Sequence, residues 1–147
     1  MIDHWGPWRF LLGDWVGRGG GTPGVAESGA CSFALELNEQ VIARRNSASY
    51  PAAADRPAFT HEDLLYIYRD GGDRYRAWYV DTEGHTIEYR ATADGTRATF
   101  ESEADVRGMR YRLRYEKNDG GVALRFDIAP PGADFQDYIS GELERKR

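Results

Sequence analysis

The chain has 147 residues and a net charge of −5 at pH 7, with 24 acidic and 19 basic residues. This length fits a single domain over residues 1–147, which buries about 68–70% of the surface that the unfolded chain exposes. The negative charge argues against nucleic-acid binding, which requires clustered Lys and Arg in excess. No stretch approaches the ~18 apolar residues of a membrane-spanning helix. We therefore expect no nucleic-acid partner and no membrane span.

The cysteine content and the first residues indicate a compartment. Cys31 is the one cysteine, so the chain has no internal disulfide, and a free thiol fits a reducing environment. Residues 1–5 lack a basic segment followed by an apolar run, so no signal peptide is predicted. We expect a soluble cytoplasmic protein, and we keep a homodimer as an alternative to a monomer.

Residues 3–12 predict a short helix that closes one end of the fold. Asp3 is the expected N-cap, because a carboxylate there accepts backbone N–H groups of the first turn. Pro7 is tolerated only because it falls in that turn. Four apolar side chains recur at helical spacing and give the helix one apolar face: Trp5, Trp8, Leu11 and Leu12.

From Trp15 onward the apolar period becomes two, which is typical of strands. Strands are predicted near 15–21, 27–37, 40–50, 61–69, 74–81, 86–92, 96–102, 107–117, 121–129 and 136–146. Most of the turns between them are short and rich in Gly, Asn and Asp, as hairpins require. Ten short strands in hairpin succession predict an all-β fold, an up-and-down antiparallel β-barrel closed at one end by the N-terminal helix.

The alternation also predicts which side chains face the interior. Tyr111, Leu113 and Tyr115 alternate with arginines, so the aromatic and apolar set should point inward. Arg44 and Arg45 put a charge on each face of their strand. We take Arg45 as the inward one and as an anchor for a ligand carboxylate or phosphate. The alternative is that either arginine reaches a rim or forms a structural pair.

Gly13-Asp14-Trp15 on the first strand resembles the opening motif of the calycin superfamily, which includes lipocalins, fatty-acid-binding proteins and nitrobindin-like proteins. The resemblance implies that Trp15 closes the base of the barrel and that a basic residue of the last strand packs across it. Arg145 is the expected partner, with Arg147 next. The whole pattern is similar to small, uncharacterised bacterial lipocalin-like proteins.

Two departures from this superfamily bear on the ligand. Nitrobindin-like proteins hold haem through a histidine late in the chain, whereas histidines occur here only at positions 4, 61 and 85. A haem-binding protein with His85 as an atypical ligand is kept as an alternative. Fatty-acid-binding proteins use an Arg-x-Tyr pair near the C-terminus, and the segment 137–142 lacks it.

The densest polar cluster lies around a predicted hairpin. If Tyr79 points inward, Asp81 does too, and His85 begins the next strand, so the three side chains are expected to converge. A His–Asp pair of this kind can act as a general base. The alternative is a plain turn with His85 half exposed. His61 and Asp63 share a strand face, but Glu62 points away, so no metal site is predicted there.

We expect a non-enzymatic barrel that holds one small apolar or amphipathic molecule, with no cofactor and no metal. The candidate ligand-binding residues are Arg45, Tyr66, Tyr79, Asp81, His85 and Tyr111. One alternative is an enzyme that uses the same cavity, with His85 and Asp81 as general acid and base. Another is a filled barrel that acts only through its surface.

Overall fold

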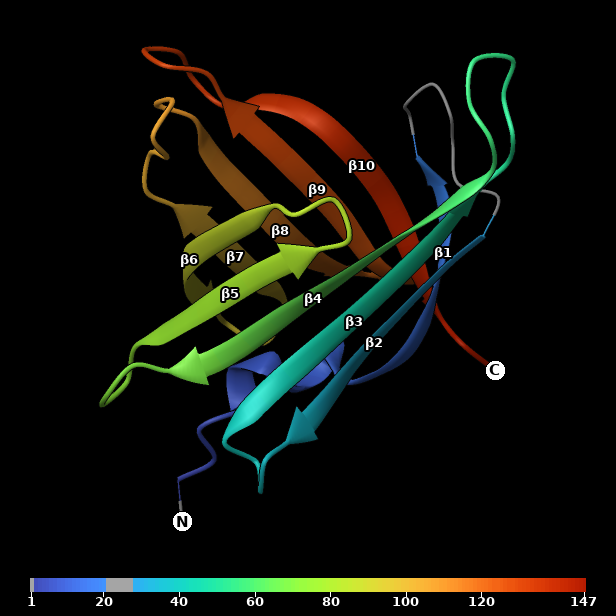
Figure 1. Cartoon of the computed structure of the whole chain (residues 1–147). Coiled ribbons are helices and arrows are strands. Elements are labelled where there is room, and N and C mark those ends of the chain that lie inside the picture. Colours follow the sequence, from blue (N-terminus) through green and yellow to red (C-terminus); the bar gives the residue numbers. More distant parts are fainter. Residues whose placement is uncertain (1, 21–27) are drawn as a thin grey trace.

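The computed structural model describes residues 2–20 and 28–147, which form a closed antiparallel barrel of ten strands (Figure 1). The strand order around the barrel is β1-β10-β9-β8-β7-β6-β5-β4-β3-β2. Each strand pairs with its neighbours in sequence, and β1 closes the barrel against β10, so the predicted up-and-down order is confirmed. Residues 21 and 27, at the ends of two predicted strands, lie outside the described residues. The strands are β1 (Gly13–Gly20), β2 (Ser28–Glu36), β3 (Val41–Tyr50), β4 (Phe59–Arg69), β5 (Tyr75–Asp81), β6 (Thr86–Ala93), β7 (Arg97–Ser102), β8 (Arg110–Asn118), β9 (Gly121–Ala129) and β10 (Gln136–Arg145).

The N-terminal helix η1 (Gly6–Leu11) is a single short 3-10 element, so the longer helix predicted over 3–12 is wrong in extent. It begins beside Pro7, which fits only the first turn of a helix. Asp3 is not its N-cap, because the cap position is Trp5 and has no side-chain hydrogen bond. Asp3 instead accepts the backbone N–H of Trp5 at 3.1 Å, one step before the helix. Among the described residues, no helix has the length and apolar character needed to span a membrane.

The half of the barrel next to η1 is packed with large side chains. Trp8 of η1 is fully buried, and its ring lies 5.6 Å from that of Phe100 on β7. The rings of Phe33 and Tyr115 meet edge to face, with centroids 5.3 Å apart. Ile42 is also fully buried in the same cluster. Close-packed protein interiors have few voids larger than a water molecule, so from these buried contacts we infer that this half is a solid core.

The predicted alternation on β8 is confirmed. Leu113 and Tyr115 are buried, and Tyr111 packs against the same core cluster. On the outer face of the same strand, Arg112 and Arg114 both donate to Asp127 of β9 at 2.9 and 2.8 Å. The charged set therefore braces the outside of the barrel while the aromatic set fills the inside.

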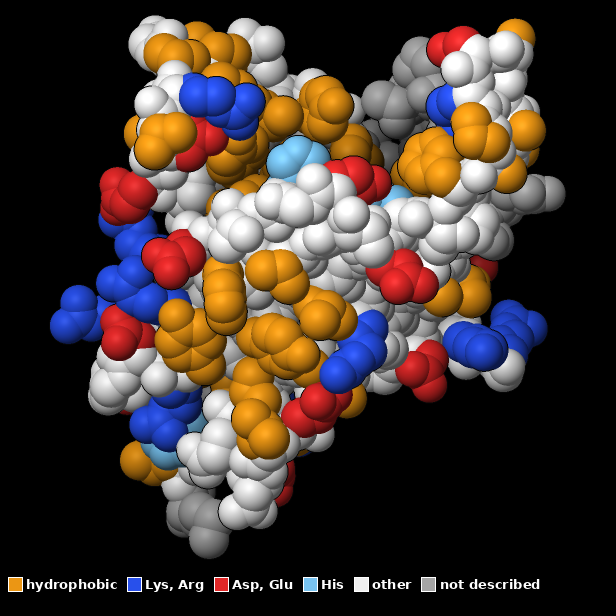
Figure 2. Space-filling model, viewed as in Figure 1, with side chains coloured by type: hydrophobic (Ala, Val, Ile, Leu, Met, Phe, Trp, Pro, Cys, Tyr) orange, Lys and Arg blue, Asp and Glu red, His pale blue; other side chains and the backbone are white. Residues whose placement is uncertain are grey.

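The end of the barrel opposite η1 is open. Figure 2 shows the molecule hollowed there, between the raised loop 51–58 on one side and the raised connections after β7 and β9 on the other. The β5–β6 hairpin is lower and forms the front lip of this hollow. We call this end the mouth, and it is where polar side chains gather.

Candidate functional site

At the closed base of the barrel, residues of the first and last strands contact each other. The guanidinium of Arg145 lies 4.3 Å from the centroid of the Trp15 ring, so the contact expected from the sequence motif is present. Arg145 also donates to the backbone carbonyl of Leu12 at 2.9 Å. The indole of Trp15 donates to the carbonyl of Leu11 at 2.8 Å. Gly13 has a φ of 128°, and a Cβ there would lie 2.6 Å from Arg145, which explains the glycine of the motif.

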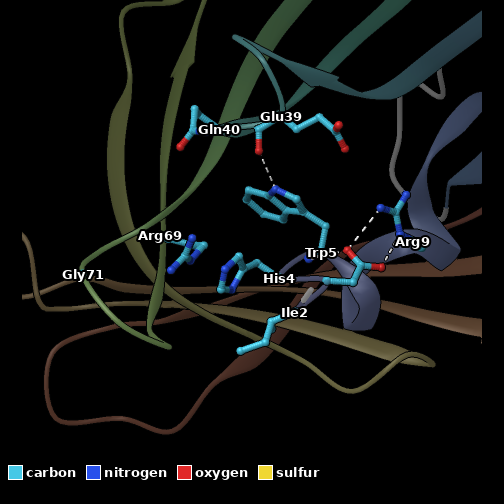
Figure 3. Close-up of a pocket in the computed structure, with 9 residues that line it drawn as sticks. Ile2, His4, Trp5, Arg9, Glu39, Gln40, Arg69 and Gly71 are labelled. Carbon is cyan, nitrogen blue, oxygen red and sulfur yellow. Dashed lines mark hydrogen bonds and ion pairs between the residues drawn. The ribbon is translucent and has the colours of Figure 1, made fainter.

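A pocket of about 500 Å³ lies on the outside of this closed end (Figure 3). Two pairs of its polar groups are engaged with each other. The indole of Trp5 donates to the carbonyl of Glu39 at 2.7 Å, and Arg9 pairs with Asp3 at 2.7 Å. This pocket is therefore the seam between η1 and the β2–β3 turn, and sequence reasoning did not predict it.

A buried arginine forms the floor of the mouth. Arg44 is 5% exposed and forms an ion pair with Asp63, which is 6% exposed. Its Nη1 donates to the hydroxyl of Tyr115 at 3.0 Å, and its guanidinium lies 5.9 Å from the ring centroid of Tyr79. Burial acts to lower the pKa of Arg44, but Tyr115 and neighbouring groups outweigh it and hold that pKa above its ordinary value. The floor therefore carries a fixed positive charge matched by a carboxylate.

The structure corrects two of the predicted interior residues. Arg45 lies on the outer face, half exposed, with its Nη1 2.5 Å from Glu36. Ile42 is buried inside, and the two-residue period then turns Arg44 inward and Arg45 outward. Tyr66 stands between the fully buried Leu65 and Ile67, so the same period puts Tyr66 on the outer face. Val41 and Ala43 are buried as well as Ile42, so the apolar run on this strand gave no sequence signal that could have identified Arg44.

From the floor, a chain of contacts runs to the lip through His61. Asp63 accepts a hydrogen bond from the Asn46 amide at 3.0 Å, and the same carboxylate oxygen lies 2.9 Å from His61 Nε2. The other ring nitrogen, His61 Nδ1, lies 2.7 Å from a carboxylate oxygen of Glu83. The hydrogen bond from His61 is the main cause of a lowered pKa at Glu83. His61 thus bridges the buried ion pair and the exposed lip.

The predicted cluster around the β5–β6 hairpin is also present. One oxygen of Asp81 accepts the hydroxyl of Tyr79 at 3.0 Å and lies 2.9 Å from His85 Nδ1. Its other oxygen accepts the backbone N–H groups of Glu83 at 3.0 Å and His85 at 2.9 Å. Burial acts to raise the pKa of Asp81, but these hydrogen bonds outweigh it and the pKa is lowered. Tyr79, Asp81 and His85 therefore converge as one prediction has it, and Asp81 also holds the turn as the alternative has it. The His85 side chain is 67% exposed.

Across the barrel from β4 and β5, strands β8 to β10 supply an aromatic wall. The rings of Tyr111 and Phe126 stack with centroids 6.1 Å apart, and Tyr138 meets Phe126 at 6.2 Å. The hydroxyl of Tyr111 donates to Asp105 at 3.0 Å. The mouth therefore has one side of aromatic rings and one side of histidines and carboxylates.

Comparison with known proteins gives no family for this chain. No model of a protein family matches its sequence, and no curated protein matches it. The calycin resemblance stays a prediction that rests on the barrel-closing residues.

The mouth does not fit a haem. His85, the histidine expected as the haem ligand, stands on the lip with its side chain 67% exposed. The half of the barrel below them is filled by aromatic side chains such as Phe100. With this ligand exposed and the space below it filled, the described residues offer no enclosed haem site, so a haem role is not carried forward.

Proposed function

We propose that this chain is a small-ligand-binding barrel that holds one amphipathic molecule in its mouth. The observation that carries the proposal is the division of the interior into a solid half and an open half. Small barrels of this kind have room for one ligand when their interior is not filled. Here the open half joins aromatic rings to a small set of fixed polar groups, which is the usual make-up of a ligand pocket.

Arg44 supports the same proposal. A buried ion pair is commonly no more stabilising than a pair of apolar side chains of the same volume. Arg44 and Asp63 nevertheless sit at the floor of the open half, with the aromatic face of Tyr79 beside them. In the proposed function, the Arg44–Asp63 pair replaces Arg45 as the polar floor beneath the ligand, and Tyr79, Tyr111 and His85 complete the contacts to the ligand.

Native mass spectrometry of the purified, untagged protein is the first experiment. A retained small molecule is expected as a mass above that of the chain, and its mass identifies it. A dye-displacement titration with apolar and amphipathic compounds follows. Tyr138→Ala removes an exposed ring from the aromatic wall, and Tyr68→Ala, which removes an exposed tyrosine from the outer face, is the control. We expect weaker binding in Tyr138→Ala only. Absence of a retained mass together with absence of saturable binding would refute the proposal.

A second candidate function is a cavity enzyme, and the His85–Asp81 contact favours it. Asp81 holds His85 through Nδ1, which leaves Nε2 to exchange a proton with a molecule in the mouth. Exchanging His85 for Ala separates the two functions. An enzyme loses turnover of a bound carbonyl or ester while the fold is kept, and a pure binding protein shows no turnover in either form.

The cytoplasmic location stays part of the proposal. It rests on Cys31, the chain's one cysteine, whose thiol is buried and free. Fractionation of the native host cells tests it, with recovery in a soluble reducing fraction as the expected result.

A further inference from the structure

Three side chains on the lip of the mouth meet with the geometry of a metal site. One ring nitrogen of His61 and one carboxylate oxygen each from Asp81 and Glu83 all lie within 4.8 Å of one another. Zinc holds nitrogen and oxygen ligands at about 2.0–2.2 Å in a tetrahedron, so two ligands of one ion stand about 3.3–3.6 Å apart, between the 2.7 Å from His61 Nδ1 to Glu83 and the 4.8 Å limit of the cluster. The Glu83 side chain is 41% exposed and free to make the remaining small movement.

His61 is oriented in the way that metal-binding histidines are. A histidine ligand usually gives its second ring nitrogen to a carboxylate, which fixes the ring and leaves the other nitrogen for the metal. Asp63 stands at His61 Nε2 and is itself fixed by Arg44 and Asn46, with its side chain 5% exposed. The nitrogen that remains, Nδ1, faces Glu83 at 2.7 Å. The buried ion pair of Arg44 and Asp63 therefore holds the His61 ring in place.

The charge around this nitrogen favours a cation. Asp81 is equally well fixed, because Tyr79 and two backbone N–H groups hold its carboxylate, whose side chain is only 3% exposed. Within residues 2–20 and 28–147, the ion pairs of Asp81 and Glu83 are with histidines alone, and neither carboxylate reaches a Lys or Arg. Arg44 is occupied by Asp63. Two carboxylates and one imidazole thus share a space with no fixed positive charge of its own.

We propose that His61, Asp81 and Glu83 bind one divalent transition-metal ion of the zinc class at the lip of the mouth. Asp63 is a positioning residue in this site, and a fourth coordination position faces the hollow, as in zinc sites that keep a place for water or substrate. The sequence did not predict this site because its ligands come from β4, the end of β5 and the following turn. The site is independent of whether the mouth also holds an organic molecule.

The test uses untagged protein freed of metal by a chelator and titrated with Co²⁺, followed by displacement with Zn²⁺. We expect one equivalent of Co²⁺ with visible absorption bands that Zn²⁺ abolishes. Glu83→Gln and His61→Ala each weaken binding by about 10-fold or more. Asp63→Asn weakens it by about 10–100-fold and shifts the Co²⁺ bands, which a merely structural role would not do. Circular dichroism checks that each variant is folded, and the exposed Glu83→Gln keeps the test decisive.

Two controls separate this site from chance binding. His4→Ala removes the one histidine outside the mouth, and Glu62→Gln removes an exposed carboxylate next to His61 that faces the other way. Both are expected to bind Co²⁺ like the wild type. The proposal is overturned if wild-type protein shows no saturable Co²⁺ binding, if His61→Ala binds as tightly as wild type, or if His4→Ala alone abolishes binding.

Discussion

Exchanging Arg44 for Met removes the charge from the floor of the mouth while keeping most of the side-chain volume. Asp63 is then left as a buried carboxylate without its cation, and the Tyr115 hydroxyl loses its donor. Removing one partner of a buried ion pair typically costs about 3–5 kcal/mol of stability. A domain has only about 5–15 kcal/mol in total, so Arg44→Met should lose a large share of it.

Arg45→Met is the matched control, because it changes the adjacent arginine on the opposite face. Arg45 and Glu36 are 50% and 34% exposed, and a surface pair of this kind contributes about 0–1 kcal/mol. Urea unfolding followed by tryptophan fluorescence measures both. With a loss of about 4 kcal/mol and a slope of about 2 kcal/mol per molar urea, the midpoint of Arg44→Met should fall by about 2 M. The midpoint of Arg45→Met should move by less than about 0.5 M.

A double variant, Arg44→Met with Asp63→Leu, tests whether the loss comes from the stranded charge. Removing both ions relieves the buried carboxylate, so part of the stability should return even though Asn46 and His61 lose their acceptor. The reasoning is refuted if Arg44→Met and Arg45→Met lose the same stability. It is also refuted if the double variant is less stable than Arg44→Met alone.

Three further predictions concern the base, the core and the rim. Gly13→Ala puts a Cβ at a φ of 128° and against Arg145, so a loss of about 1–3 kcal/mol in urea unfolding is expected; a loss no larger than that of Gly17→Ala, where a Cβ makes only ordinary contacts, would contradict this. Burial raises the pKa of the Cys31 thiol to about 11, so a disulfide reagent at pH 8 should label it only in urea, and rapid labelling of native protein would show that the thiol is accessible. At Asp105, burial acts to raise the pKa, but hydrogen bonds from backbone N–H groups and Tyr111 outweigh it and bring it to about 2. Because that pKa is lowered, the stability that Asp105 contributes is complete above pH 3.8 and is lost as the pH falls through about 2. Asp105→Ala should therefore melt at a lower temperature than wild type at pH 7. This difference should persist down to about pH 3.8 and vanish by about pH 2.

The sequence by itself determined the elements and their order around the barrel. Strand periods and hairpin turns are local patterns, because side chains alternate every two residues and a short turn can join only antiparallel neighbours. Strands that follow one another mostly through short turns leave little choice of topology, so the barrel could be predicted. The contact of Trp15 with Arg145 was predicted from the resemblance of Gly13-Asp14-Trp15 to the calycin opening motif, and both residues lie on the strands that close the barrel.

Only the tertiary structure decided which side chains form the site. From the sequence, Arg44 and Arg45 could equally well face the interior. The register of β3 places Ile42 and Arg44 on the same inward face. The meeting of His61 with Glu83 depends on the pairing of β4 with β5 and on the turn that follows. Whether a barrel interior is solid or open depends on the summed volumes of side chains from all ten strands. Local periodicity carries none of this information, because contacts across a barrel join residues that are far apart in the chain.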